Sequence, residues 1–194
     1  MNQELNEDQV KELKEKLKDM RPEEIQELMQ KQCLFCNILN GDVPSKKIYE
    51  DNKVLAILDI NPAAMGHTLL FPKEHFSILS QTPDEIVAHL FKVANKISSV
   101  LFDTLKSEGT SIYLGNGQIA GQTVPHVAIH IIPRFKDDKV SIGWKGVNIS
   151  EKDMAKLEGD LSKKLKSISF ENKEEKIETK KPKKIENVSF ERIP

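Results

Sequence analysis

The sequence predicts an α+β fold in which one long helix accompanies an antiparallel sheet. Three observations carry this prediction. Short β-prone runs are separated by turn signals, one long amphipathic stretch lies among them, and no apolar run approaches the roughly 20 residues that a membrane-spanning helix needs. With 194 residues, of which 38% are hydrophobic and 30% charged, the chain suits one ordinary domain with charged extensions.

The N-terminal extension, residues 1–31, is predicted to be helical from residue 7 onwards. Its first apolar residues recur at helical spacing: Val10, Leu13, Leu17 and Met20. Pro22 suits the first turn of a second helix. The apolar stripe of that helix is formed by Ile25, Leu28 and Met29. We expect the extension to pack on the following domain or on a partner.

The central domain, residues 32–140, contains the predicted sheet. Its strand candidates are residues 48–51, 54–60, 67–71, 111–114 and 124–132. Pro83 opens an amphipathic helix that extends to about Lys106. The apolar stripe of this helix consists of Ile86, Leu90, Val93, Ile97 and Leu101. Glycines then mark a loop over residues 115–122. Hairpins combined with a single helix indicate an antiparallel sheet.

A helical segment, residues 141–169, and a charged tail, residues 170–194, complete the chain. The helix itself is predicted at 150–167, with an apolar stripe of Met154, Leu157, Leu161 and Leu165. Residues 170–187 are rich in lysine and glutamate, which is typical of a mobile linker. The closing VSFERIP regains apolar character, and we expect it to dock locally.

The charges exclude several classes of partner. Lys plus Arg total 29 against 30 Asp plus Glu, so the net charge is −1 and no global field attracts nucleic acid or a membrane surface. Only the tail sequence KKPKK, residues 180–184, offers a local salt-dependent contact to nucleic acid. The polar, acidic N-terminus is unlike a secretory signal. The expectation is therefore a cytoplasmic protein without a membrane anchor.

The final strand candidate carries the chemistry. Alternate side chains of a strand share one face, so His126, Ala128 and His130 are expected to line one side. Two imidazoles would then stand about 7 Å apart, over a substrate-sized opening at Ala128. The preceding loop, residues 115–122, contains glycines that let main-chain N–H groups approach phosphate oxygens.

At this point the sequence resembles a known family. The segment G-Q-T-V-P-H-V-A-I-H-I-I-P-R is similar to the signature of the histidine-triad (HIT) superfamily, normally His-φ-His-φ-His-φ-φ with φ apolar. C-L-F-C-N-I-L-N-G-D-V-P-S-K-K-I-Y-E-D and L-D-I-N-P-A-A-M-G-H-T-L-L-F-P-K-E-H match as well. The resemblance covers residues 33–137. It implies a five-stranded antiparallel sheet with one long helix, and a homodimer formed through that helix and the strand before the glycine loop.

The resemblance also implies a reaction and shows where this chain departs from it. Members bind nucleoside phosphates, and in many of them the middle histidine attacks the α-phosphorus to form a covalent nucleotidyl intermediate. Here the middle position is Ala128, whose methyl group has no lone pair. We therefore expect the covalent reaction to be lost. Either the protein binds nucleotides without hydrolysis, another group activates water, or Ala128 is an engineered inactivation.

The only cysteines, Cys33 and Cys36, form a C-x-x-C pair. In a reducing compartment this indicates a metal or redox site rather than a structural disulfide. A redox pair usually opens a helix in a βαβ context, which the sequence lacks, while two such thiolates suit zinc. The resemblance supplies two further ligands, His75 and His126, and implies a closed structural zinc. A reduced pair without metal remains the alternative. His89, within the long helix, is expected at the surface.

The nucleotide site follows from the same resemblance. Base-contacting residues would be Leu34, Phe35, Ile38 and Leu69. The carboxylate of Asp59 would accept hydrogen bonds from the ribose hydroxyls. Phosphate-binding residues would be His67, Asn116, Gln122, Thr123 and His130. If His130 is protonated, it adds a positive charge there. Arg134 is a weaker candidate.

Three functions remain open from the sequence. The first is a nucleoside-phosphate-binding protein, with a purine nucleotide as its expected ligand. The second is an active hydrolase of phosphoramidates or dinucleoside polyphosphates that uses another group. The third is a scaffold or RNA-associated protein that acts through its extensions.

Overall fold

The structure is a computed structural model and describes residues 20–168. The chain divides into two compact units, Met1–Ile142 and Gly143–Pro194, which are taken separately below. The expectations for residues 1–19 and for the tail from residue 169, including the linker and the docking of VSFERIP, lie outside the described residues. The division of residues 1–140 into an extension and a domain stays a prediction.

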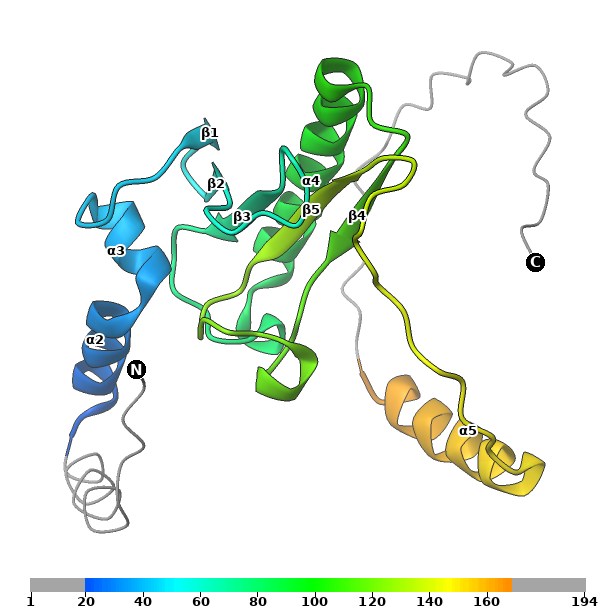
Figure 1. Cartoon of the computed structure of the whole chain (residues 1–194). Helices are drawn as coiled ribbons and strands as arrows, with labels where there is room; N and C mark the ends of the chain where they lie inside the picture. The colour runs from blue at the N-terminus through cyan, green and yellow to red at the C-terminus, as the bar shows by residue number, and fades with distance from the viewer. Residues whose placement is uncertain (1–19, 169–194) are drawn as a thin grey trace, which may run out of the picture. The chain divides into compact units, whose positions relative to one another are not determined.

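The first unit contains one five-stranded antiparallel sheet, which confirms the predicted fold class (Figure 1). Its strands are β1 (Lys47–Glu50), β2 (Val54–Leu58), β3 (Thr68–Pro72), β4 (Gly109–Tyr113) and β5 (Ile129–Arg134). They lie in the order β1-β2-β3-β5-β4. Strand β5 is therefore an interior strand, and its backbone pairs with β3 on one side and with β4 on the other.

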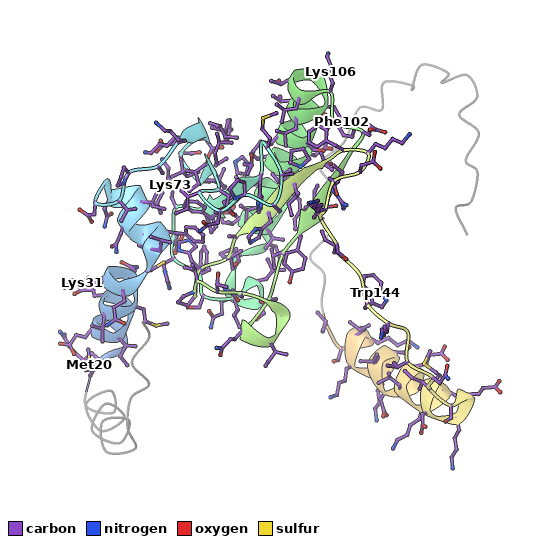
Figure 2. All side chains as sticks on the ribbon, viewed as in Figure 1. Met20, Lys31, Lys73, Phe102, Lys106 and Trp144 are labelled. Atoms are coloured by element: carbon purple, nitrogen blue, oxygen red, sulfur yellow. The ribbon has the colours of Figure 1, made fainter. Side chains whose placement is uncertain are left out.

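One face of the sheet is covered by the long helix α4 (Asp84–Leu105). Pro83 caps the helix at its start, and Lys106 ends it with a left-handed φ of 56° (Figure 2 labels Phe102 and Lys106 at this end). The predicted stripe of α4 is buried and packs against apolar residues of β2, β3 and β5. Val127, Ile129 and Ile131 belong to this core. Residues 126, 128 and 130 alternate with them and therefore face the other way.

A second apolar cluster occupies the opposite face of the sheet. It joins the short helix α3 (Leu34–Asn40) to β2 and β3, with Cys33, Phe35 and Cys36 among its members. Helix α2 (Pro22–Gln32) precedes α3 and ends at Cys33, and Gly41 terminates α3 with φ 88°. The C-x-x-C pair is thus anchored in a packed layer rather than in a loose loop.

The predicted strand over residues 124–132 is too long at its beginning. Strand β5 starts only at Ile129. Before it, the N–H of His126 donates to the carbonyl of Val124 and that of Val127 donates to Phe76. Pro72 on the neighbouring strand and Pro125 have no N–H to donate, so the ladder cannot continue past this point. Strand β2 also ends earlier than predicted, at Leu58.

The second unit is described over residues 143–168. Helix α5 (Glu151–Lys166) begins at Ser150, whose hydroxyl accepts a hydrogen bond from the N–H of Asp153, as expected for a capped start. Every described side chain of this unit is exposed, including Trp144 (Figure 2). None of the helices in residues 20–168 combines the length and apolar composition that crossing a bilayer requires.

Candidate functional site

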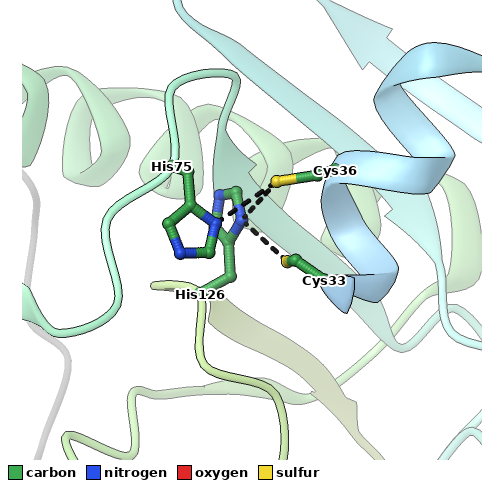
Figure 3. Close-up of side chains that lie close together, drawn as sticks. All are labelled: Cys33, Cys36, His75 and His126. Carbon is green, nitrogen blue, oxygen red and sulfur yellow. Dashed lines mark hydrogen bonds between the residues drawn. The ribbon is translucent and has the colours of Figure 1, made fainter. Parts of the chain in front are cut away.

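Four side chains from three distant segments meet beside α3. Cys33 and Cys36 come from the start of α3, His75 from the turn after β3, and His126 from the turn before β5 (Figure 3). Cys33 Sγ lies 3.4 Å from His126 Nδ1, and Cys36 Sγ lies 3.3 Å from His75 Nδ1 and 3.7 Å from His126 Nδ1. All four side chains are buried.

These distances fit a tetrahedral zinc ion. Zn–S and Zn–N bonds of about 2.3 and 2.05 Å at the tetrahedral angle place sulfur and nitrogen about 3.6 Å apart. The outer nitrogens of both rings are also occupied. Nε2–H of His126 donates to the carbonyl of Pro72 across 2.9 Å, and His75 Nε2 lies 3.4 Å from the Ser77 hydroxyl. Such contacts fix the tautomer that leaves Nδ1 free to bind a metal.

Protonation of the four groups supports the same conclusion. Burial, together with the neighbouring Cys33 sulfur, raises the pKa of the Cys36 thiol to about 12. Burial lowers the pKa of His126 to about 4, so its ring is neutral at neutral pH. A buried pair of thiolates needs a cation, and a divalent ion displaces their protons. The cluster of Cys33, Cys36, His75 and His126 is therefore suited to hold a metal.

A cavity of about 320 Å³ opens next to this cluster. His126, Ala128 and His130 line it together, so the three alternate positions share one side even though β5 begins after the first two. The cavity runs from apolar residues of α3 to the end of the glycine loop. It has the size and mixed lining of a small-molecule site.

The apolar end of the cavity contains all four residues predicted to contact a base. Leu34, Ile38 and Leu69 line it, and so does Phe35. The ring of Phe35 is stacked on Phe71 with centroids 4.4 Å apart. One face of the Phe35 ring is therefore covered by Phe71.

A carboxylate oxygen of Asp59 lies within 4.8 Å of ring nitrogens of His67 and His130. One of its oxygens accepts the N–H of Asn61 at 2.8 Å, and the other lies 3.5 Å from Nδ1 of His67. Its carboxylate lines the cavity. The hydrogen bond from Asn61 is typical of an aspartate in a turn. Because Asp59 also lines the cavity, its carboxylate oxygens keep lone pairs that a ligand hydroxyl could use.

The imidazoles of His67 and His130 form a directed pair. The N–H of Ala63 donates to Nδ1 of His67 across 3.1 Å, so this nitrogen carries the lone pair and neutral His67 has its proton on Nε2. Nε2 lies 3.1 Å from Nδ1 of His130 and donates to it. His130 in turn carries its proton on Nε2. This order argues against a metal held by Asp59, His67 and His130, because Nε2 of His67 has no free lone pair.

Both rings of this pair are neutral at neutral pH. Burial lowers the pKa of His67 and that of His130, and it outweighs the opposite effect of Asp59 on each. A neutral His130 offers one N–H donor at Nε2 and no positive charge.

The glycine loop is braced by Gln122. The side-chain amide of Gln122 donates to the carbonyls of Ser77 and Val124 and accepts the N–H of Gly117. Asn116 accepts the N–H of Leu79 and does not line the cavity, whereas Gln122 and Thr123 do. The amide of Gln122 is thus committed to holding the loop in this conformation.

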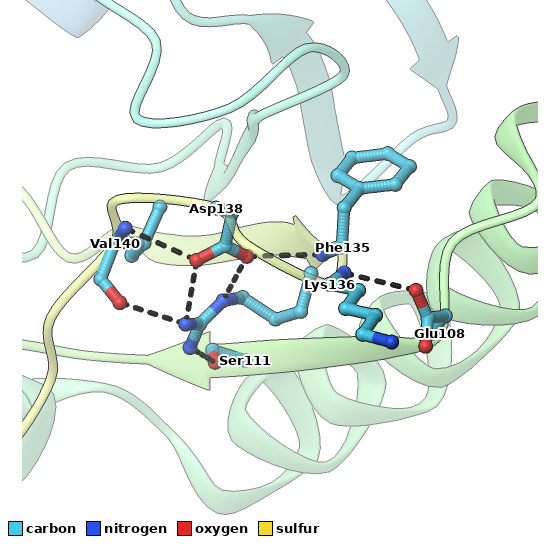
Figure 4. A network of polar contacts seen from close by, with 7 residues as sticks. Glu108, Ser111, Phe135, Lys136, Asp138 and Val140 are labelled. Carbon is cyan, nitrogen blue, oxygen red and sulfur yellow. Dashed lines mark hydrogen bonds and ion pairs between the residues drawn. The ribbon is translucent and has the colours of Figure 1, made fainter.

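Two further residues singled out from the sequence have structural partners. Arg134 donates from Nε and Nη2 to Asp138 and from Nη1 to Ser111, which holds the turn after β5 (Figure 4). Its guanidinium does not line the cavity. His89 is not a free surface residue, because its Nε2 lies 2.7 Å from the carboxylate of Asp51.

Several cavity residues were not identified from the sequence. They lie in the turn after α3 and at the end of β2: Val43, Pro44, Ser45, Ile57, Leu58, Ile60 and Asn61. The turn signal at Asp42-Val43-Pro44, directly after the helix predicted to contact a base, could have indicated them. The contact from Ala63 is made by the main chain and leaves no trace in the sequence.

Comparison with known proteins settles the family. The profile described as the HIT domain matches residues 40–137. The chain belongs to the HIT family. "Protein hit" of Bacillus subtilis is 38% identical over 138 residues, which is 70% of this chain and 95% of that protein. A Candida albicans protein named adenosine 5'-monophosphoramidase HNT1 is 34% identical over 145 residues, 72% of this chain and 95% of its own.

Solved HIT structures share the fold. A HIT-family protein of Bacillus subtilis has a TM-score of 0.65 and 36% identity, covering 69% of this chain and 97% of its own. A structure described as a Zn-bound histidine triad family protein from Mycobacterium smegmatis has a TM-score of 0.56 and 36% identity, covering 72% and 99%. The HIT domain of this chain thus has both an enzyme relative and a zinc-bound relative by name.

Proposed function

We propose that this HIT protein binds a purine nucleoside 5′-phosphate and has lost the covalent nucleotidyl-transfer step. One observation carries the proposal. A single cavity is lined by apolar residues of α3, by Asp59, and by Ala128 and His130. The base would contact the apolar wall, the ribose hydroxyls would donate to Asp59, and the phosphate would accept hydrogen bonds from Thr123 and from Nε2 of His130.

The absent nucleophile is the second part of the proposal. Ala128 occupies the cavity position between His126 and His130, where the family signature has its middle histidine. A methyl group cannot attack phosphorus. His130 does not replace the missing nucleophile. Its Nδ1 accepts the hydrogen bond from His67, so its other ring nitrogen, Nε2, carries a proton and has no lone pair with which to attack. Loss of a nucleophile commonly reduces turnover by several orders of magnitude.

A zinc ion is the proposed cofactor. Cys33, Cys36, His75 and His126 would hold it in a closed four-coordinate site, which leaves no open position for a substrate. When bound, the ion would cross-link α3 to the turns flanking β3 and β5. Its contribution would therefore be to stability and to the position of His126 in the cavity wall. Thiolate ligands require a reducing compartment, which supports a cytoplasmic location.

We also propose that the protein is a homodimer. Large apolar side chains are exposed on α4 and on the edge strand β4: Phe91, Phe102, Ile112 and Tyr113. These are the elements through which the resemblance implies pairing. An apolar surface on an edge strand and its adjacent helix is typical of an interface between subunits.

Calorimetric titration with adenosine and guanosine 5′-monophosphates tests the binding proposal. We expect saturable heat for at least one of them, and none for inorganic phosphate alone at the same concentration. Absence of heat at millimolar nucleotide would refute it.

An active hydrolase is the second candidate, favoured by the name of the Candida albicans relative. It requires a water molecule to attack phosphorus directly. Turnover of adenosine 5′-phosphoramidate that is abolished by His130→Ala and unaffected by repeated purification would support this candidate over simple binding.

A further inference from the structure

The cavity has no cationic side chain among the described residues. Its lining includes Asp59 but neither lysine nor arginine. Arg134, the arginine nearest to His130 in the sequence, is bound through two nitrogens to Asp138, which neutralises its charge locally. A zinc ion held by two thiolates and two neutral imidazoles also carries no net charge. With neutral histidines, the charge of the lining is that of Asp59 alone.

The ionisable groups around His130 do not add a positive charge at neutral pH. His67 on the β3 side lies 3.1 Å away, and Tyr113 on β4 has its ring centroid 6.0 Å from that of His130. Asp59, at the end of β2, belongs to the same group of neighbouring atoms within 4.8 Å. The N–H of Ala63 opposes protonation of His67 at Nδ1, and burial lowers the pKa of both imidazoles.

The donors that remain for a phosphate are uncharged. His130 offers Nε2–H. Thr123, which lines the cavity, offers a hydroxyl and a main-chain N–H with no hydrogen-bond partner in the part of the chain that the structure describes. Such donors satisfy a single negative charge well, but a second charge would have no cation to meet and would lie near the Asp59 carboxylate.

We propose that this site selects nucleoside 5′-phosphoryl groups that carry one negative charge, such as diesters and amidates, over the dianion of a free monophosphate. The inference rests on the proposed function, because it concerns the same cavity. It adds the charge state of the ligand that the cavity accepts.

Titration of the zinc-loaded full chain with AMP and with the methyl ester of AMP tests this. At about pH 8, AMP is a dianion and the ester a monoanion. We expect the ester to bind at least about tenfold more tightly. At about pH 5.5, below the second phosphate pKa of roughly 6, the affinity of AMP should rise to approach that of the ester. The affinity of the ester should change far less.

Two variants make the test specific. Asp59→Asn removes the carboxylate in the cavity. It should reduce the ratio between the affinities for the ester and for AMP at about pH 8, even if both affinities change. Asp42→Asn removes an exposed carboxylate that does not line the cavity, and it should leave the ratio of the two affinities unchanged. AMP binding as tightly as the ester at about pH 8 would overturn the charge selection alone. If neither ligand binds at millimolar concentration, both this inference and the proposed function are wrong.

Discussion

Cys33 and His126 lie 93 positions apart in the chain, yet the Cys33 sulfur is 3.4 Å from Nδ1 of His126. No hydrophobic pattern requires this approach. It is the separation expected for two ligands of one ion, and it joins the helix that forms the apolar wall of the cavity to the turn that leads into β5. Stability and ligand binding are therefore expected to depend on the same few atoms.

Removal of zinc is expected to destabilise the first unit. A structural zinc in a small site contributes on the order of 10 kcal/mol, so a strong chelator should lower the melting temperature markedly and Cys33→Ser should do the same without chelator. Calorimetric melting with and without added zinc measures this. One zinc per chain by elemental analysis is the accompanying expectation, and a melting temperature insensitive to both treatments would contradict it.

Replacement of Ala128 by histidine is expected to restore a nucleophile. The new Nε2 would attack the α-phosphorus of adenosine 5′-phosphoramidate, the P–N bond would break, and the departing amine would take its proton from the solvent. Intact mass spectrometry under non-acidic conditions should then detect one added adenylyl group. Ala128→Gln, of comparable size but without a nucleophile, is the control and should remain unmodified.

The metal-free protein is expected to lose stability in acid. Burial lowers the pKa of His126 to about 4 in the folded state, whereas the unfolded chain titrates near 6.5. Between these values the unfolded state binds more protons, so stability is complete above about pH 6.5 and falls as the pH drops towards 4, by about 3 kcal/mol from this group. Urea unfolding of metal-free protein across that range checks the sign. A flat profile, or one that is more stable in acid, would show that His126 is not buried as a neutral ring.

Gly115→Ala is expected to weaken nucleotide binding with little effect on the sheet. A Cβ at this position would lie 2.7 Å from the carbonyl of Ala120 and 3.0 Å from the N–H of Gln122, so the loop must shift. We expect an affinity loss of about tenfold, in keeping with 1–3 kcal/mol of local strain. Gly109→Ala is the matched control, because its Cβ would meet only the Arg134 side chain at 3.6 Å. Equal losses of nucleotide affinity in the two variants would mean that the affinity does not depend on the conformation of the loop.

Much of the fold followed from local pattern. The stripe of α4 and the alternation through β5 could be predicted because helical and strand periods are properties of the sequence itself. The start of β5 could not, since it depends on Pro72 of a neighbouring strand, which removes a donor from the ladder. Strand limits set by a partner strand are not encoded in the strand alone.

The site was predictable to the extent that side chains define it. The cluster of Cys33, Cys36, His75 and His126 was identified through spacing and family resemblance, and the structure brings all four together. The commitment of Gln122 to the loop and the direction of the His67–His130 pair were not identifiable. Both depend on main-chain groups, at Ser77 and Ala63, whose positions arise only from the folded chain.

His126 completes the sulfur-containing cluster and also forms part of the cavity wall. Because one imidazole belongs to both, a change at the two sulfur atoms reaches the cavity wall through a single side chain, whose Nε2 stays hydrogen-bonded to the carbonyl of Pro72.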